Sequence, residues 1–436
     1  MTEKSFRIIT LGCKVNQYES AYLKESLIAE GWHLSQEKDK ADITIINTCI
    51  VTQEASFQSR QAIRKSIREN PSSITAAVGC YAQVFPEDLS KIEGIHIIAG
   101  NREKLRLSYL LKKGNRATIP LLHSKDFPEE TTFDYIPIND FHGRTRAFLK
   151  IQDGCESFCS YCIVPLARGP LRSLDPNRVI GALRSLSEAD YKEVVITGIH
   201  LGKYGQDLME GVGLRELLHR IGKEGLPLRI RLSSLEPNEI DKELIDLISS
   251  EEWLCPHVHI PLQSGDDEVL KKMDRRYTSK QFATRIERIH EGMPLAAIGV
   301  DVMAGFPGED ERAYKNTFSL IRDLPVSYLH VFPFSARKGT AASTFRDQVK
   351  KDLIKKRAKE LRDLGKRKRE AFYRSCLGKE FSVLAEGWHS AGEEMIRGLS
   401  ENYLPVIFHS SMLVKNRLLK IRLEDIRGAD VLGRSV

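Results

Sequence analysis

The sequence has 436 residues, 41% of them hydrophobic and 8% aromatic, and its formal net charge is +7. A chain of this size and composition is expected to form two or three domains with ordinary apolar cores. It shows neither an amino-terminal signal peptide nor a run approaching the ~20 apolar residues of a membrane span. This argues against secretion and membrane insertion and predicts a cytoplasmic protein. The modest positive charge permits an RNA partner without requiring one.

Apolar runs alternate with helical patterns over residues 1–125. Strands are expected at 6–11, 42–47, 74–78 and 95–99, with helices after each of them, the last one capped by Asn101. This βαβα order predicts a mostly parallel, doubly wound sheet.

Three cysteines of this region, Cys13, Cys49 and Cys80, each follow one of the first three strands. Ligands of doubly wound sheets bind beyond the carboxyl ends of the strands, so these thiols are expected to share one crevice. A single free cysteine is most often just a small buried apolar residue. Three at equivalent positions favour a metal site with one open position, and the wide spacing of all eight cysteines argues against a disulfide framework.

A polar, turn-rich linker at 127–143 separates this region from a second αβ pattern. Strands are expected at 146–152, 193–198, 229–234, 257–263, 297–304 and 328–332, with helices between them. Six such units are too few for a complete eight-stranded barrel, so we expect a curved, partly open (β/α)6 barrel. Chemistry in such folds takes place at the carboxyl ends of the strands.

The loop after the first of these strands holds Cys155, Cys159 and Cys162 in the spacing CxxxCxxC. A structural zinc site normally has four ligands, and the nearest further candidate is His200. Three thiolates leave one metal position open, which suits catalysis, and they favour an iron–sulfur cluster over zinc.

The last hundred residues combine a basic helix with short strands. Residues 350–369 predict a strongly cationic helix, which either packs one apolar stripe on the barrel or contacts phosphates. The short strands after residue 380 predict a small all-β barrel, because closure removes exposed strand edges.

Several of these stretches resemble known families. The CxxxCxxC triplet with Tyr161 before its last cysteine closely resembles the radical S-adenosylmethionine (SAM) signature. The segments around Cys13, Cys49 and Cys80 resemble the amino-terminal domain of the methylthiotransferase family, and 395–403 resembles the TRAM module, an RNA-binding β barrel. The resemblance spans the chain and implies a methylthiotransferase domain at 1–125, a radical SAM core at 141–372 and a TRAM-like domain at 375–436.

The stretch Gly12-Cys-Lys-Val-Asn-Gln-Tyr-Glu is most similar to the branch that modifies threonylcarbamoyladenosine in tRNA. That resemblance implies two [4Fe-4S] clusters, on Cys13/Cys49/Cys80 and on Cys155/Cys159/Cys162. It also implies a SAM-derived radical that abstracts hydrogen from adenine C2 next to the anticodon, followed by transfer of a methylthio group.

The same resemblance implies roles for further residues and partners. The expected SAM contacts are Tyr161, Gly198, Ser233, Glu236, Gln263, Asp301 and Phe332, and the expected RNA contacts are Arg168, Lys366, Lys368 and Tyr403. The implied partners are tRNA, a flavodoxin- or ferredoxin-type electron donor and a sulfur donor. The protein itself is expected to be a monomer.

Two other interpretations remain open at this point. The same machinery could modify isopentenyladenosine tRNA or a ribosomal-protein side chain. Alternatively, the chain could be a zinc-stabilised RNA-binding protein without catalytic activity.

Overall fold

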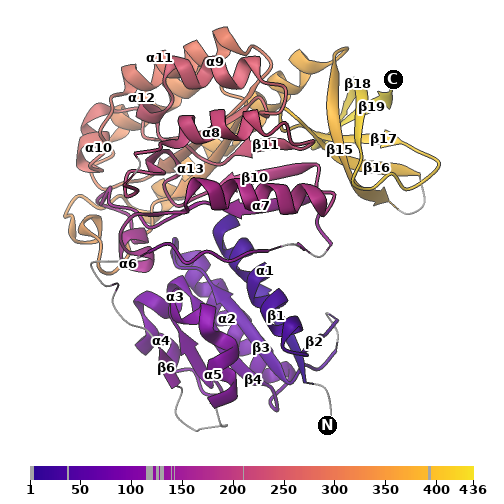
Figure 1. The fold of residues 1–436 in the computed structure, drawn as a ribbon. Helices are drawn as coiled ribbons and strands as arrows, with labels where there is room; N and C mark the ends of the chain where they lie inside the picture. The colour runs from indigo at the N-terminus through magenta and orange to yellow at the C-terminus, as the bar shows by residue number, and fades with distance from the viewer. Residues whose placement is uncertain are drawn as a thin grey trace.

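The structure, a computed structural model, describes residues 4–36, 39–113, 121–123, 127, 132–138, 140–141, 143–209, 211–390 and 394–436. Three bodies follow one another along the chain (Figure 1). An amino-terminal α/β layer lies beneath a central α/β body, and a small all-β body lies at one end of the central one. None of the helices in the described part of the chain has the length and apolar character to cross a bilayer.

The amino-terminal body is built on one six-stranded sheet in which every neighbouring pair is parallel. The strand order is β2 (His33–Leu34), β1 (Ser5–Thr10), β3 (Ile43–Thr48), β4 (Ile74–Gly79), β5 (Ile97–Ala99) and β6 (Leu121–His123). The helices are α1 (Lys14–Ala29), α2 (Gln53–Glu69), α3 (Cys80–Val84), α4 (Pro86–Ser90) and α5 (Leu107–Lys113).

Both faces of this sheet are covered, as expected for parallel strands. Ile45 contributes to an apolar cluster with Leu23 and Leu27 of α1, whereas its neighbour Ile46 contributes to a second cluster with Ile63 of α2. The prediction of a parallel sheet is therefore confirmed. The predicted helix cap at Asn101 is wrong, because its amide instead donates to the Ala167 carbonyl (2.6 Å) and accepts from Lys104.

The central body contains six parallel strands in chain order, divided into two three-stranded sheets. The first sheet holds β7 (Arg146–Lys150), β10 (Glu193–Thr197) and β11 (Arg229–Leu232), and the second holds β12 (His257–Gln263), β13 (Ala297–Ala304) and β14 (Tyr328–Pro333). A single bridge between Ile230 and Leu254 and a bond from Leu235 N to His259 O (3.0 Å) link the two sheets. The helices are α7 (Pro176–Glu188), α8 (Leu214–Lys223), α9 (Lys242–Ser250), α10 (Asp267–Lys272), α11 (Ser279–Gly292) and α12 (Glu311–Asp323).

Side-chain alternation gives these strands an apolar outer face and a polar inner face. Val258, Ile260 and Leu262 of β12 pack in the main core together with Ile286 and Ile289 of α11. The intervening residues of β12, His257 and His259, therefore face the inside of the partial barrel.

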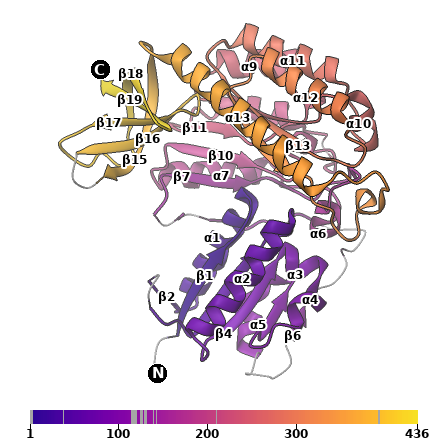
Figure 2. The same ribbon diagram turned by 180° about the vertical axis from the view of Figure 1, so that it is seen from behind.

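The basic helix, α13 (Lys351–Cys376), packs along β14 and closes the back of the central body (Figure 2). Its buried stripe includes Ile354, Ala358, Leu361 and Leu364. The interpretation of α13 as a helix that packs one apolar stripe on the barrel is confirmed.

The carboxyl-terminal strands close into a barrel in the order β15-β16-β17-β19-β18. Their bounds are Glu380–Ser390, Met395–Ser400, Pro405–His409, Leu418–Arg427 and Asp430–Ser435, in the order β15 to β19. The barrel docks on the amino ends of β11 and β12. Arg229 and Arg231 donate to the carbonyls of Leu399 (2.9 Å) and Ser400 (3.1 Å), and the Tyr403 ring stacks on His257 with centroids 4.3 Å apart.

The predicted linker is only partly described, since 128–131, 139 and 142 lie outside the described residues. The part that is described packs between the two α/β bodies. Ile136, Ile138 and Phe141 are buried in the main core, and Tyr18 of α1 donates to the Ile136 carbonyl (2.6 Å).

Candidate active site between two cysteine triads

The structure brings Cys13, Cys49 and Cys80 together at the carboxyl edge of the amino-terminal sheet. Cys13 directly precedes α1, Cys49 follows β3, and Cys80 begins α3 after β4. Burial, together with the nearby Cys80 and Cys13 thiols, raises the pKa of Cys49 to about 12. Gly12 makes this approach possible, because at its φ of +96° a β-carbon would lie 2.8 Å from the Cys49 sulfur.

Cys13 is the most accessible thiol of the first triad, since Cys49 and Cys80 are buried. The surrounding protein nevertheless raises the pKa of the Cys13 thiol by removing water from it. Beside Cys80, the Asn101 amide lies 3.5 Å from the sulfur and donates to it.

The second triad lies in the loop between β8 (Gln152–Asp153) and α6 (Val164–Arg168). Phe158 takes a φ of +48° in this loop, and the Cys162 amide donates to the Cys159 carbonyl (2.9 Å). Two side chains from other parts of the central body reach its sulfurs, one in the loop after β10 and one in the loop after α10. The Arg275 guanidinium donates to the Cys159 sulfur (3.5 Å), and His200 Nδ1 lies 3.5 Å from the Cys155 sulfur.

His200 and Cys155 stabilise each other's charged forms. Although burial works against it, the contacts with Cys155 and Glu239 raise the pKa of His200 to about 10. Burial also opposes ionisation of Cys155, but the hydrogen bonds with His200 and Ser157 hold the pKa of its thiol below the usual value. The carboxylate of Glu239, 2.6 Å from His200 Nε2, orients the ring.

Neither cysteine triad has the dimensions of a zinc site. Thiolates on one tetrahedral zinc lie about 3.8 Å apart, since Zn–S bonds are ~2.3 Å long. Within the described parts of the chain, three potential ligand atoms lie within 4.8 Å of one another only at His259, Asp301 and His330. In each cysteine triad the three sulfurs therefore do not all lie within 4.8 Å of one another, which argues against a compact zinc site and favours an iron–sulfur cluster.

A buried network of charges joins the two triads. Arg168, at the end of α6, pairs with Glu19 of α1 (2.6 Å), and Glu19 also accepts from Lys104 (2.5 Å) and Lys150 (3.1 Å). Lys150 in turn pairs with Asp153 (3.0 Å), two residues before Cys155. The carboxylate of Glu19 is thus shared by three cations, which hold the pKa of Glu19 well below its usual value although burial opposes this.

This network corrects the expectation for Arg168. Its side chain is 1% exposed and lies inside the protein, so it cannot reach the phosphates of an RNA bound at the surface. Glu19, Lys104 and Lys150 were missed in the sequence, because each looks like an ordinary surface charge and only the docking of the two bodies brings them together.

A cavity of about 450 Å³ opens beside the second triad. Cys159, His200, Glu236 and Arg275 contribute to its wall. Glu236, an expected SAM contact, pairs here with Arg275, and the Tyr277 hydroxyl lies 3.1 Å from the same guanidinium. In the sequence, His200 was a candidate only for a fourth zinc ligand, and Glu239 and Arg275 were not predicted as site residues. His200 and Glu239 nevertheless follow β10 and β11 at this edge of the partial barrel.

The other expected SAM contacts are distributed around the same edge. The Ser233 hydroxyl is buried without a hydrogen-bond partner in the described part of the chain, as expected for a group that waits for a ligand. Gly198 lies against the Gln152 side chain, so that a β-carbon at this position would be 2.8 Å from Gln152 Oε1. Gln263 takes a φ of +60° at the end of β12. Tyr161 instead packs edge-on against Phe306 in a core cluster, whereas Phe332 is exposed.

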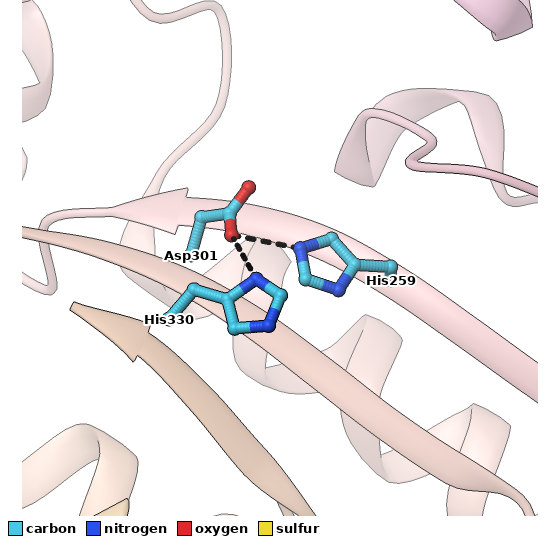
Figure 3. Close-up of side chains that lie close together, drawn as sticks. All are labelled: His259, Asp301 and His330. Carbon is cyan, nitrogen blue, oxygen red and sulfur yellow. Dashed lines mark hydrogen bonds and ion pairs between the residues drawn. The ribbon is translucent and has the colours of Figure 1, made fainter. Parts of the chain in front are cut away.

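Asp301 lies on the inner wall of the partial barrel between two histidines (Figure 3). It accepts from His259 Nε2 (2.8 Å) and contacts His330 Nδ1 (3.3 Å), one residue from each of β13, β12 and β14. Burial opposes its ionisation, but these two contacts hold the pKa of Asp301 below the usual value. Tyr328 supports the arrangement with its hydroxyl 3.1 Å from His259 Nδ1.

The three remaining RNA candidates occupy different positions. Lys366 is exposed on α13, near Asp363 (3.4 Å). Lys368 donates to the Arg322 (2.5 Å) and Leu324 (2.6 Å) carbonyls at the end of α12, so its ammonium is already engaged. Tyr403 is half-buried, stacked between the small barrel and the central body.

Comparison with known proteins agrees with the two-part site. Residues 5–100 match the family described as "Uncharacterized protein family UPF0004", and residues 149–321 match the radical SAM superfamily. The fold is similar to that of the radical SAM methyltransferase TsrM of Kitasatospora setae, with a TM-score of 0.54, 15% identity and coverage of 76% of this chain and 75% of that one.

Relatives over nearly the whole chain are tRNA-modifying enzymes. The threonylcarbamoyladenosine tRNA methylthiotransferase MtaB of Aquifex aeolicus is 39% identical and covers 91% of this chain and 95% of its own length. The MtaB of Bacillus subtilis is 35% identical, with 95% and 92% covered. The tRNA-2-methylthio-N(6)-dimethylallyladenosine synthase of Oceanobacillus iheyensis is 30% identical, with 97% and 82% covered. Identity at this level over nearly the full length, together with the match to the radical SAM superfamily, places the chain in the radical SAM methylthiotransferase family.

Proposed function

We propose that this enzyme inserts a methylthio group at C2 of N6-threonylcarbamoyladenosine in tRNA. One observation carries the proposal: two cysteine triads, each with an open position, are joined by the buried network around Glu19 and Arg168. A reaction that needs both a radical and a transferable sulfur requires two such sites at one substrate. The choice of substrate is inferred from the relatives that modify threonylcarbamoyladenosine, which are up to 39% identical to this chain.

Each triad would hold one [4Fe-4S] cluster. When bound, the cluster on Cys155, Cys159 and Cys162 supplies radical chemistry from SAM, and the cluster on Cys13, Cys49 and Cys80 supplies a sulfur for transfer. Nearby side chains would stabilise the negative charge on the ligating sulfurs. Arg275, His200 and Asn101 each place an N–H group beside one sulfur.

We infer that SAM occupies the 450 Å³ cavity and the strand ends around it. A zwitterion with a sulfonium needs acceptors for its cationic groups and donors for its carboxylate. Glu236 and Glu239 provide the former, and the unpartnered Ser233 hydroxyl is placed to bind a polar group. Gly198 and Gln263 shape the backbone there; Asp301 and Phe332 line the inner wall toward the substrate.

We further propose that the chain divides functionally at 1–125, 141–372 and 375–436, with a TRAM-like module at the end. Exposed lysines of α13 such as Lys366, and the outer surface of the closed barrel, would contact the tRNA backbone. With a tRNA substrate, the enzyme would act in the cytoplasm, as a monomer. A flavodoxin- or ferredoxin-type protein would supply the electrons, and a separate donor would replace the sulfur.

The test is mass spectrometry of tRNA nucleosides from cells that lack this chain. We expect 2-methylthio-threonylcarbamoyladenosine to disappear and unmethylthiolated threonylcarbamoyladenosine to accumulate, with both restored by the intact gene but not by Cys159→Ala. An unchanged nucleoside profile would remove the assignment. Selective loss of the dimethylallyl derivative would move the protein to the other tRNA branch.

A further inference from the structure

Adjacent strands of the second sheet place two imidazoles and one carboxylate on the same face. Asp301 of β13 pairs in register with His330 of β14 on one side and with Pro261 of β12 on the other. His259 lies two residues before Pro261, so its side chain leaves β12 on the face that Asp301 also uses. Strand register therefore brings the three side chains together, on rigid elements of the central body.

The spacing of the three ligand atoms matches a single small metal ion. Oδ1 of Asp301 lies 2.8 Å from His259 Nε2 and 3.3 Å from His330 Nδ1, and all three atoms lie within 4.8 Å of one another. Ligands with bonds of ~2.1 Å to one ion lie about 3.0 Å apart at octahedral angles and about 3.4 Å apart at tetrahedral ones. Figure 3 shows both rings turned with a nitrogen toward the same carboxylate oxygen. The arrangement thus admits one cation bound by all three side chains.

Tyr328 holds the His259 ring in the orientation that a metal ligand needs. Its hydroxyl lies 3.1 Å from His259 Nδ1 and 2.8 Å from His257 Nε2. Gly299 leaves room for this hydroxyl, because a β-carbon there would lie 2.3 Å from the Tyr328 oxygen. Histidines that bind metals almost always donate a hydrogen bond from their second nitrogen, which fixes the tautomer. When Nδ1 of His259 donates to Tyr328, Nε2 is left as the unprotonated nitrogen that a cation requires.

The three side chains are enclosed on one side and accessible on the other. Those of His259 and Asp301 are 9% and 19% exposed, whereas that of His330 is 53% exposed. A cation therefore has a path of entry, and the protein leaves some of its coordination positions free. Three protein ligands with free positions are typical of sites at which the ion binds a further ligand, and not of closed structural sites.

We propose that His259, Asp301 and His330 bind one divalent cation of the zinc and iron(II) class. Two imidazoles and one carboxylate suit such ions, whereas magnesium and calcium favour oxygen ligands alone. Water fills the remaining positions in the free enzyme. The inference goes beyond the proposed function, since it adds to the two cysteine triads a metal site that the methylthiolation described above does not require.

The experiment titrates Mn²⁺ into the holoenzyme under anaerobic conditions. Both cysteine triads are first loaded with their clusters, whose oxidised [4Fe-4S] form gives no EPR signal, so that the six-line signal of free Mn²⁺ can be followed. We expect one Mn²⁺ to bind per chain and Zn²⁺ to displace it, because zinc binds nitrogen and oxygen sites more tightly. X-ray absorption of the zinc-loaded holoenzyme should show nitrogen and oxygen neighbours at about 2.0–2.2 Å and no sulfur at ~2.3 Å.

Variants assign the ion to these side chains. Asp301→Asn and His330→Asn should each weaken Mn²⁺ binding by more than about 100-fold, and Tyr328→Phe should weaken it by about 10-fold, because it removes a group that only orients a ligand. The exposed position of His330 makes its substitution the least disturbing to the fold. Iron content is measured for every variant, to confirm that the clusters are still held.

His409→Asn is the matched control, because it removes an imidazole that also pairs with a carboxylate, that of Glu394 (3.2 Å), but on the surface of the small barrel. It should bind Mn²⁺ as the wild type does. A wild type that takes up neither Mn²⁺ nor Zn²⁺ would overturn the inference and leave the three side chains as a hydrogen-bonded group. Equal binding by the wild type and Asp301→Asn, or a sulfur neighbour in the zinc spectrum, would also overturn it, since the ion would then lie elsewhere.

Discussion

Single residues decide whether the first triad can assemble. Gly12 has a φ of +96° and lies so close to Cys49 that a β-carbon would be 2.8 Å from its sulfur. Gly31 also has a positive φ, +83°, but nothing lies within 4 Å of the position of its missing β-carbon. Both glycines have a positive φ, but only at Gly12 would a β-carbon contact a cysteine sulfur, that of Cys49.

Gly12→Ala should therefore lose the first cluster, whereas Gly31→Ala should keep it. The left-handed backbone costs alanine about 1–2 kcal/mol at either position, but only at Gly12 does the methyl group displace a thiol. Anaerobic reconstitution and iron analysis check this. We expect the iron content of Gly12→Ala to be about half that of the wild type, as one of two four-iron groups is lost. Equal iron in both variants would show that the contact does not matter.

At the scale of the elements, α1, α6 and β7 meet through one carboxylate. Glu19 is fully buried and shared by Arg168, Lys104 and Lys150. Burying such a group is expensive, and the network is favourable only while all of its members are present. It fixes the relative position of the two triads more strictly than apolar packing would, because the hydrogen bonds are directional.

Glu19→Gln should destabilise the protein by about 3–5 kcal/mol, because three buried cations then lack their counter-charge. Urea unfolding at neutral pH measures this. The control is Glu224→Gln, which breaks the exposed pair with Arg184 and should cost less than about 1 kcal/mol. Similar losses in the two variants would mean that the network contributes no more than a surface ion pair.

At the scale of the whole molecule, the small barrel closes the amino end of the central one. Arg229 and Arg231 bind its carbonyls while both pair with Glu193. Burial opposes ionisation of Glu193, but the two guanidiniums lower its pKa to about 2. One ionised carboxylate thus supports the docking of the small barrel.

Acid should weaken this docking. Because the pKa of Glu193 is lower in the folded protein than the usual ~4.3, its contribution is fully present above that value and is lost as the pH falls toward 2. The unfolding free energy, measured between pH 3 and pH 7, should decline below about pH 4.5 with a contribution from this group. In Glu193→Gln the stability should be lower throughout and that part of the slope absent. An unchanged slope would show that other carboxylates govern the acid response.

Much of the architecture could be predicted from local patterns. The parallel strands of both α/β bodies lie within a few residues of the expected positions, because buried parallel strands are continuous apolar runs between helices. The six cysteines of the two triads could be predicted as candidate ligands because thiols at strand ends and in a CxxxCxxC loop are typical of metal ligands. The residues around them were harder to find: His200, Arg275 and Glu19 look like any polar residue in a loop or helix.

The sequence alone thus determined which segments form strands and helices, where the cysteines fall on them, and to which family the chain is similar. These properties follow from side-chain periodicity and from the spacing of chemically distinctive residues. Only the tertiary structure decided that Arg168 is buried between two bodies and that Tyr403 stacks on His257. Burial and electrostatic pairing depend on contacts between residues far apart in the chain, and no local pattern records them.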